Sequence, residues 1–165
     1  MTYVRKSDCS ESLPIVEVLD RYDKNDWFLF GFLTTAGIRT PERLLKMFEE
    51  LMNQLGEEND CYGKRLHWFV RVEVAGEEHR HLHFVLGRHK VADGLHRKFS
   101  AVAAGGFLRG KWKMHGIAKI KPYDATRDGV GYVTKAFTAK EKADPYLMSY
   151  GLKKVFFKEV KNEGR

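Results

Sequence analysis

Two consecutive stretches of β-forming residues, joined by a short turn, limit most strongly what this chain can fold into. Residues His67–Ala75 and His79–Gly87 are rich in β-branched and aromatic residues, and the three residues between them include Gly76. This pattern is typical of a β-hairpin. If the hairpin is centred on the middle of that turn, Glu73 pairs directly with His81.

Side chains alternate between the two faces of a strand, so His81 and His83 share one face. The apolar positions of the two strands share the other face: Trp68, Val70, Val72, Val74, Leu82, Phe84 and Leu86. We expect that apolar face to pack on a helix, with the two histidines, Arg71 and Glu73 on the opposite side. Cross-strand Cβ atoms on one face lie about 4.5–5.5 Å apart. Two imidazoles and one carboxylate can therefore converge without backbone strain.

Two nitrogen ligands and one oxygen ligand suit a divalent metal ion and leave positions open for water or a phosphate oxygen. The sequence therefore predicts a metal site made of Glu73, His81 and His83. A solvent-facing strand that is merely rich in histidine would show the same His-x-His triplet, and this alternative stays open. A cupin-type site also uses His-x-His, but it requires a glutamate shortly downstream, and none closely follows His83.

The first helix is signalled at both ends. Thr40 is a suitable N-cap, Pro41 suits the first helical position, and Gly56 suits the stop. Apolar residues recur between them at helical spacing and are expected to face the core: Leu44, Leu45, Phe48, Leu51, Met52 and Leu55.

The remaining elements follow from composition and spacing. We predict a buried strand over 26–35, a second helix over 92–104 that stops at Gly105 and Gly106, a strand over 111–121 and a third helix over 132–142. The inward residues of the second helix should be Leu95, Phe99, Val102 and Ala103. Residues 153–160 suit a strand or a short helix. The order of elements indicates an α+β fold with an antiparallel sheet.

Charge is unevenly distributed along the chain, whose formal net charge is +7. Residues 1–87 hold 11 Lys and Arg against 15 Asp and Glu, whereas residues 88–165 hold 18 against 7. The basic half also carries aromatic residues, which suits a polyanion with stackable bases. Arg71, Lys111 and Lys113 are the candidate DNA contacts. Solubility alone would also account for a basic chain.

Composition restricts the setting of the protein. The 165 residues suffice for a single domain, 1–165, and the 43% hydrophobic content predicts a folded chain. No apolar run approaches the roughly 20 residues of a membrane span, and the polar start 1–12 lacks a signal core. Cys9 and Cys61 have no metal-type spacing, so we expect free thiols, a cytoplasmic location and no membrane partner.

Tyr132 and Lys135 are three residues apart and share one face of the predicted third helix. A tyrosine can attack phosphorus and form a covalent phosphotyrosine. Its ordinary pKa of about 10 makes it a poor nucleophile at neutral pH, so a metal-polarised phosphate and a nearby lysine would help. A half-buried tyrosine beside a solvated lysine would give the same pattern.

Taken together, Glu73, His81-Leu82-His83 and Tyr132-x-x-Lys135 resemble the rolling-circle replication initiators of the HUH endonuclease superfamily, over about residues 26–140. The resemblance implies a central antiparallel sheet of about five strands with helices on its faces. It makes Glu73, His81 and His83 ligands of Mg²⁺ or Mn²⁺, Tyr132 the nucleophile and Lys135 its cationic companion.

The resemblance further implies nicking and rejoining of a single-stranded or hairpin replication origin, through a 5′-phosphotyrosine, in the host cell of a plasmid or virus. A chain of this length leaves no room for the helicase domain of many relatives, and the phosphate-binding loop of ATPases is absent, so no ATP is implied. Three alternatives remain: a single-strand transposase of the same superfamily, a non-catalytic single-strand DNA-binding module, and a metal-binding protein of unrelated chemistry. The transposases typically have Gln where Lys135 stands.

Overall fold

A computed structural model of the chain describes residues 19, 27–58, 66–75, 79–88, 101–127, 130, 131, 133, 145–149 and 152. Several predicted features lie outside these residues: the hairpin turn, helix residues 92–100, Tyr132, Lys135, the rest of the predicted third helix apart from Val133, and segment 153–160.

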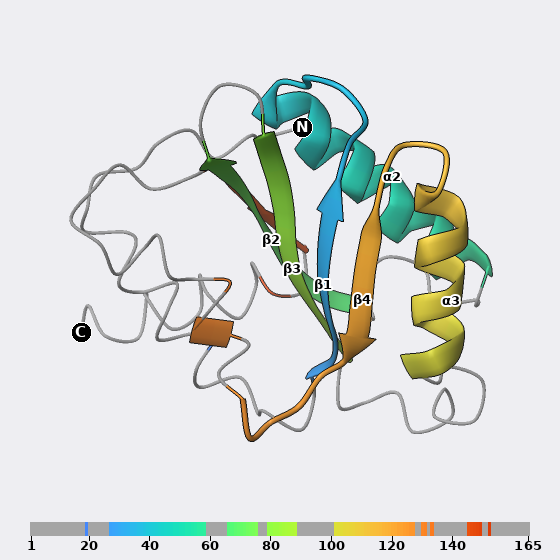
Figure 1. Cartoon of the computed structure of the whole chain (residues 1–165). Coiled ribbons are helices and arrows are strands. Elements are labelled where there is room, and N and C mark those ends of the chain that lie inside the picture. Colours follow the sequence, from blue (N-terminus) through green and yellow to red (C-terminus); the bar gives the residue numbers. More distant parts are fainter. Residues whose placement is uncertain are drawn as a thin grey trace.

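The described strands form one five-stranded antiparallel sheet (Figure 1). In chain order they are β1 (Trp27–Thr34), β2 (Leu66–Ala75), β3 (His79–Arg88), β4 (Ala118–Pro122) and β5 (Tyr146–Met148). Their order in the sheet is β4-β1-β3-β2-β5. The β2–β3 hairpin thus lies between β1 and β5, which confirms the α+β class and the antiparallel sheet.

Helix α2 (Pro41–Glu58) begins where the sequence predicts. The Thr40 hydroxyl accepts a hydrogen bond from the Arg43 amide at 3.3 Å, as an N-cap should. All six predicted inward residues are buried, and the helix continues two residues past Gly56.

Helix α3 (Ala101–Trp112) corrects the prediction for this segment, because it runs through Gly105 and Gly106 instead of stopping there. Gly105 is buried and faces β4, where an added Cβ would lie in ordinary contact with a methyl carbon of Ile120, at 3.7 Å. Trp112 then fixes the helix end, since its buried indole Nε1 donates to the Thr34 carbonyl at 2.7 Å.

Two further predictions in this region are wrong. Val102 and Ala103, both expected to face inward, are exposed, Val102 at 75%, since the inward face of α3 is made by later residues. The strand expected over 111–121 is only Ala118–Pro122, because the helix takes up its first two residues. Strand β5 was not predicted, and with three residues it is too short to show a period.

One face of the sheet packs against both α2 and α3; in Figure 1, α2 passes behind the strands and α3 lies beside β4. Phe48 of α2 contacts Phe84 and Trp68, with ring centroids 5.0 and 5.5 Å apart. Phe84 also lies directly over Gly31, where an added Cβ would come within 2.2 Å of its ring. The described side chains of the apolar hairpin face are therefore core, as predicted: Trp68, Val70, Val72, Leu82, Phe84 and Leu86.

The opposite face carries a second buried cluster, which was not predicted from the sequence. Its members are Leu19, Trp27, Phe69, Val85, Val130, Val133, Met148 and Leu152. Val130 and Val133 are in helical conformation. Residues shortly after β4 therefore cover part of the face that carries the histidines. Among the described helices, none is both long and apolar enough to cross a bilayer.

Candidate metal and nucleic-acid site

The register of the β2–β3 hairpin is the predicted one. Glu73 pairs with His81 and Arg71 pairs with His83 in the antiparallel ladder. The next strand, β1, places Phe32 beside His83 and Thr34 beside His81. The candidate ligands therefore lie on two central strands of the sheet, β2 and β3, with β1 beside them, on the face away from α2 and α3.

Glu73 and His83 are in direct contact. The Glu73 carboxylate oxygen Oε2 lies 2.6 Å from His83 Nε2, and the side chains are 39% and 4% exposed, respectively. The pKa of His83 is below its ordinary value, and the main cause is burial. The charge of Glu73 and its hydrogen bond raise the pKa, but by less than burial lowers it, and the charges of Arg71 and His81 lower it further. The imidazole is therefore neutral at neutral pH, which is the form that binds metal ions.

His81 is half-buried and packs on Phe32. Their ring centroids are 4.9 Å apart, and Phe32 also contacts the His83 ring at 5.3 Å. The His81 Nδ1 atom is buried and has no hydrogen-bond partner among the described residues. A buried imidazole nitrogen without a protein partner is costly, and a bound ligand would satisfy it.

The three side chains do not converge on one point as they stand. Within the part of the chain that the structure describes, no three His, Cys, Asp or Glu side chains are grouped closely enough to hold a metal ion. The His81 and His83 rings are 6.5 Å apart, and the Glu73 carboxylate is turned to His83. The donor types, their shared face and the unsatisfied His81 nitrogen fit a divalent ion, but a rotamer change is needed to bring all three together.

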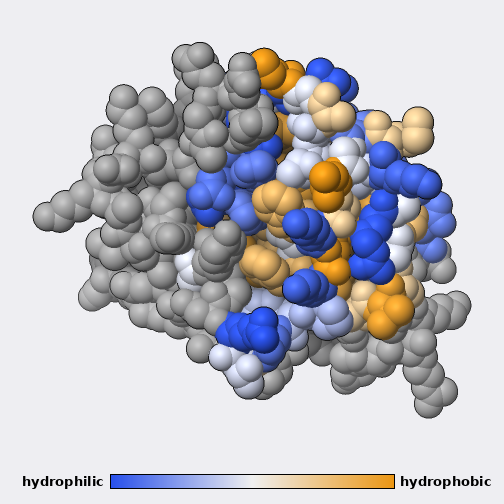
Figure 2. All heavy atoms as spheres, in the orientation of Figure 1, coloured by the Kyte–Doolittle hydropathy of each residue, from blue (hydrophilic) through white to orange (hydrophobic). Residues whose placement is uncertain are grey.

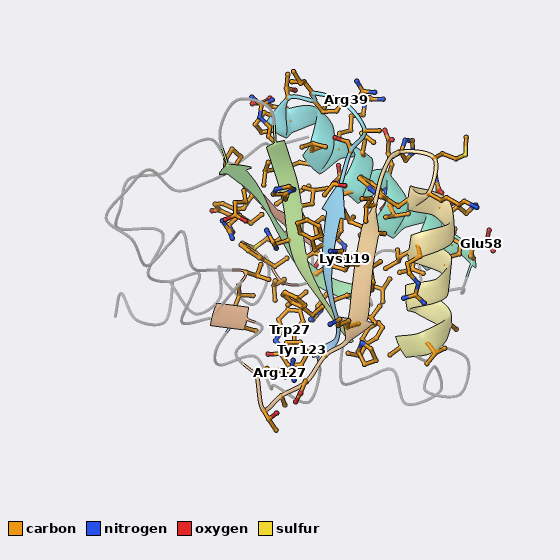
Figure 3. All side chains as sticks on the ribbon, viewed as in Figure 1. Trp27, Arg39, Glu58, Lys119, Tyr123 and Arg127 are labelled. Carbon is orange, nitrogen blue, oxygen red and sulfur yellow. The ribbon has the colours of Figure 1, made fainter. Side chains whose placement is uncertain are left out.

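A row of side chains crosses the whole sheet at the level of His83. In sheet order it consists of Lys119, Phe32, His83, Arg71 and Tyr146, each paired with the next across neighbouring strands. Lys119 is exposed and lies on β4, an edge strand of the sheet (Figure 3). The row places a cation and an aromatic ring beside the candidate ligands.

A second cation and ring lie one row further along. Lys121 pairs with Phe30, and Lys121 is exposed. The space-filling view of this face shows strongly hydrophilic and apolar side chains intermingled on its open part (Figure 2). Sequence reasoning missed these two lysines, although the alternation Lys119-Ile120-Lys121 places both of them opposite the buried Ile120.

Arg71 is buried, with 3% of its surface exposed. Its Nε donates a 2.7 Å hydrogen bond to the Val133 carbonyl, 62 residues away in the sequence. Arg71 therefore connects the hairpin to the segment that follows Gly131 in the chain. A phosphate contact for Arg71 stays a prediction, but its buried position favours a role inside the fold.

The other predicted residues divide into two groups. Tyr132 and Lys135 lie outside the described residues. Val133, inside the predicted third helix, is helical, and so are Val130 and Gly131, which were expected to precede that helix. Lys111 and Lys113 belong to the end of α3 and the loop after it, on the side of the sheet away from His83. The Lys111 ammonium lies 4.0 Å from a Glu58 carboxylate oxygen. The structure does not bring these two lysines to the histidine site.

Comparison of this chain with protein-family models, with curated proteins and with solved structures finds no match.

Proposed function

We propose that the protein is a metal-dependent endonuclease that nicks and rejoins single-stranded DNA at a replication origin through a covalent phosphotyrosine. One observation carries the proposal: Arg71, the register partner of His83, bonds to the carbonyl of Val133. The residue before Val133 is Tyr132, the predicted nucleophile. The hairpin that carries the proposed ligands is thus joined by a buried contact to the residue that follows Tyr132 in the sequence, which supports the proposal.

Glu73, His81 and His83 would hold the ion. A bound Mg²⁺ or Mn²⁺ would make the scissile phosphorus more electrophilic and offset its charge. The Tyr132 hydroxyl oxygen attacks this phosphorus, a tyrosine–phosphate bond forms, and the bond to the 3′ oxygen breaks. The Tyr132 hydroxyl gives up its proton to water, the 3′ oxygen takes up a proton from water and leaves as a free hydroxyl, and Lys135 stabilises the developing negative charge. Attack by a 3′ hydroxyl on the phosphotyrosine reverses the step and rejoins the strand.

The Lys119 and Phe32 positions support single-stranded DNA as the substrate. Single-strand binding surfaces combine cations that follow the backbone with rings on which bases stack. Lys119 and Lys121 supply exposed cations, and Phe32 and Phe30 supply partly buried rings beside them. A non-catalytic single-strand binding module would use the same surface, so the covalent step decides between the two.

The test is covalent capture. The protein is incubated with a pool of single-stranded oligonucleotides and Mn²⁺, and adducts are detected by denaturing gel shift and mapped by mass spectrometry. Tyr132→Phe removes only the attacking oxygen and should bind DNA but form no adduct. Tyr146→Phe is the matched control, because Tyr146 lies on the same face beside Arg71 and stacks on Phe69 at 5.6 Å.

Three outcomes count against the proposal. Adducts that persist in Tyr132→Phe, or a nucleotide remnant on Tyr146, would overturn the nucleophile. Absence of any adduct together with tight oligonucleotide binding would favour the binding module. A captured sequence that joins a transposon end, instead of a replication origin, would favour the transposase alternative.

A further inference from the structure

A hollow at one end of the sheet adjoins the candidate site. Its volume is about 180 Å³, and its lining includes His81, Arg80 and Arg39. The Arg80 guanidinium donates a hydrogen bond to the Arg39 carbonyl, which fixes the loop after β1 against β3. We call this hollow the rim. Its lining brings together His81, a proposed metal ligand, and the two arginines Arg39 and Arg80.

A larger groove lies beyond the rim, between α2 and the end of α3. Its volume is about 460 Å³, and Arg39, Arg43, Lys111, His115 and Glu50 are among its lining residues. Arg39 therefore lines both the rim and the groove. Figure 3 shows Arg39 at the end of the molecule where β1 passes into α2. The two hollows thus adjoin at Arg39, and we call them together the path.

The path is strongly basic. Four cations line the rim and the groove together, Arg39, Arg43, Arg80 and Lys111, against one carboxylate, Glu50. The charge of Glu50 is itself offset, because Lys46 lies 4.0 Å away. Lys111 shares its charge with Glu58 on the other side. The net charge along the path is positive, so a polyanion is favoured.

Apolar side chains are exposed beside these cations. Three of the four large hydrophobic residues that the structure describes as exposed lie on the two loops at this end: Ile38 at 65%, Met114 at 86% and Ile117 at 60%. The loops pair through the Ala36 amide and the His115 carbonyl at 2.8 Å. The exposed His115 ring packs edge-on against Trp112. Cations with apolar and ring surfaces beside them suit unpaired bases as well as phosphates.

We propose that this path binds the part of the single DNA strand that flanks the cleavage position, and leads it from His81 over the rim into the α2–α3 groove. The inference rests on the proposed nicking function for the identity of the strand. On this inference Arg39 and Arg43 bind the flanking part of a long strand, so they raise the affinity for long oligonucleotides and take no part in the chemistry at Glu73 and the histidines.

The experiment compares single-charge variants by fluorescence anisotropy, with mixed-sequence single-stranded oligonucleotides of about 8 and about 25 nucleotides. Arg39→Gln and Arg43→Gln each remove one cation from the path. Arg127→Gln is the matched control, because Arg127 is 83% exposed and lies at the opposite end of the molecule (Figure 3). One phosphate contact contributes a salt slope of about −0.7, which is about fivefold in affinity at 0.1 M salt.

Each path variant should therefore weaken binding of the long oligonucleotide about fivefold and reduce its salt slope by about 0.7, with little change for the short one. Equal losses for Arg127→Gln, equal losses for both lengths, or no loss would overturn the inference. A duplex of the same length that competes equally well would reject a single strand as the occupant.

Adduct formation on the short oligonucleotide is measured in the same samples, so that the two proposals fail separately. If no adduct forms but the length-dependent loss is found, nicking is rejected and the path stands as a single-strand binding site. If the adduct forms and the length-dependent loss is absent, only the path is rejected.

Discussion

Replacing Arg71 by leucine tests whether the buried arginine holds the hairpin and the Val133 segment together. Leucine keeps part of the buried apolar volume and removes the guanidinium. The 2.7 Å bond from Nε to the Val133 carbonyl is lost, and that carbonyl loses a charged donor in a buried position. A hydrogen bond that involves a charged group contributes about 1.5–3 kcal/mol to stability.

One effect works in the opposite direction, because removing the guanidinium also removes the cost of burying a charge. Deleting one partner of a buried polar pair nevertheless destabilises, since the remaining partner is left without compensation. We therefore expect the free energy of unfolding of Arg71→Leu to fall by about 1.5–3 kcal/mol. For a chain of this size each kcal/mol lowers Tm by about 2–4 °C, so Tm should fall by about 3–12 °C.

Urea and thermal unfolding followed by circular dichroism measure this loss. Arg109→Leu is the matched control, because Arg109 is exposed and also donates to a carbonyl, that of Ile120, at 3.1 Å. Its loss should cost only about 0.5–1 kcal/mol, since water replaces the exposed donor.

The same variant separates two proposed roles of the hairpin: anchoring the Val133 segment through Arg71, and binding the metal ion through Glu73, His81 and His83. At a temperature where Arg71→Leu is fully folded, its rate of adduct formation should fall, whereas its affinity for Mn²⁺ should change little. If the stability of Arg71→Leu matches that of the wild type, or falls no further than that of Arg109→Leu, the Val133 bond does not anchor the segment and the reasoning is refuted.

Three further predictions concern the site and the sheet. The double variant His81→Ala, His83→Ala should lose Mn²⁺-dependent cleavage, and calorimetry should detect no Mn²⁺ binding. Cleavage by this variant in chelator-treated buffer would reject the proposed ligands. Circular dichroism must confirm that the variant is folded, because His83 is buried. Gly31→Ala should cost about 1–3 kcal/mol in urea unfolding, because its Cβ would overlap the buried Phe84 ring; an unchanged midpoint would contradict this. In the metal-free protein the pKa of His83 is lowered, so the folded state favours the neutral ring. The contribution of the neutral ring to the free energy of unfolding is therefore complete above about pH 6.5 and is lost as the pH falls below that value. The difference in unfolding free energy between wild type and His83→Gln should shrink from pH 7.5 to pH 5, and a difference that grows on acidification would contradict the sign.

Local patterns in the sequence were sufficient for two parts of the fold. The start of α2 was predictable because Thr40 caps the helix through residues only a few positions away. The pairing of Glu73 with His81 was predictable because a short turn fixes the register of the two strands that it joins. In both, the decisive contacts lie within about ten residues along the chain.

Contacts between distant residues decided the rest. Helix α3 passes through Gly105 and Gly106 because Gly105 packs on Ile120 and Trp112 bonds to Thr34, and these contacts outweigh the low helix propensity of glycine. The same limit applies to the candidate site. The sequence shows two histidines and a glutamate on one face, but not that Phe32 and Lys119 lie beside them or that Arg71 bonds to Val133. Side-chain alternation is a property of one strand and can be read along the chain, whereas strand order and the cover of a sheet face depend on packing between residues tens of positions apart.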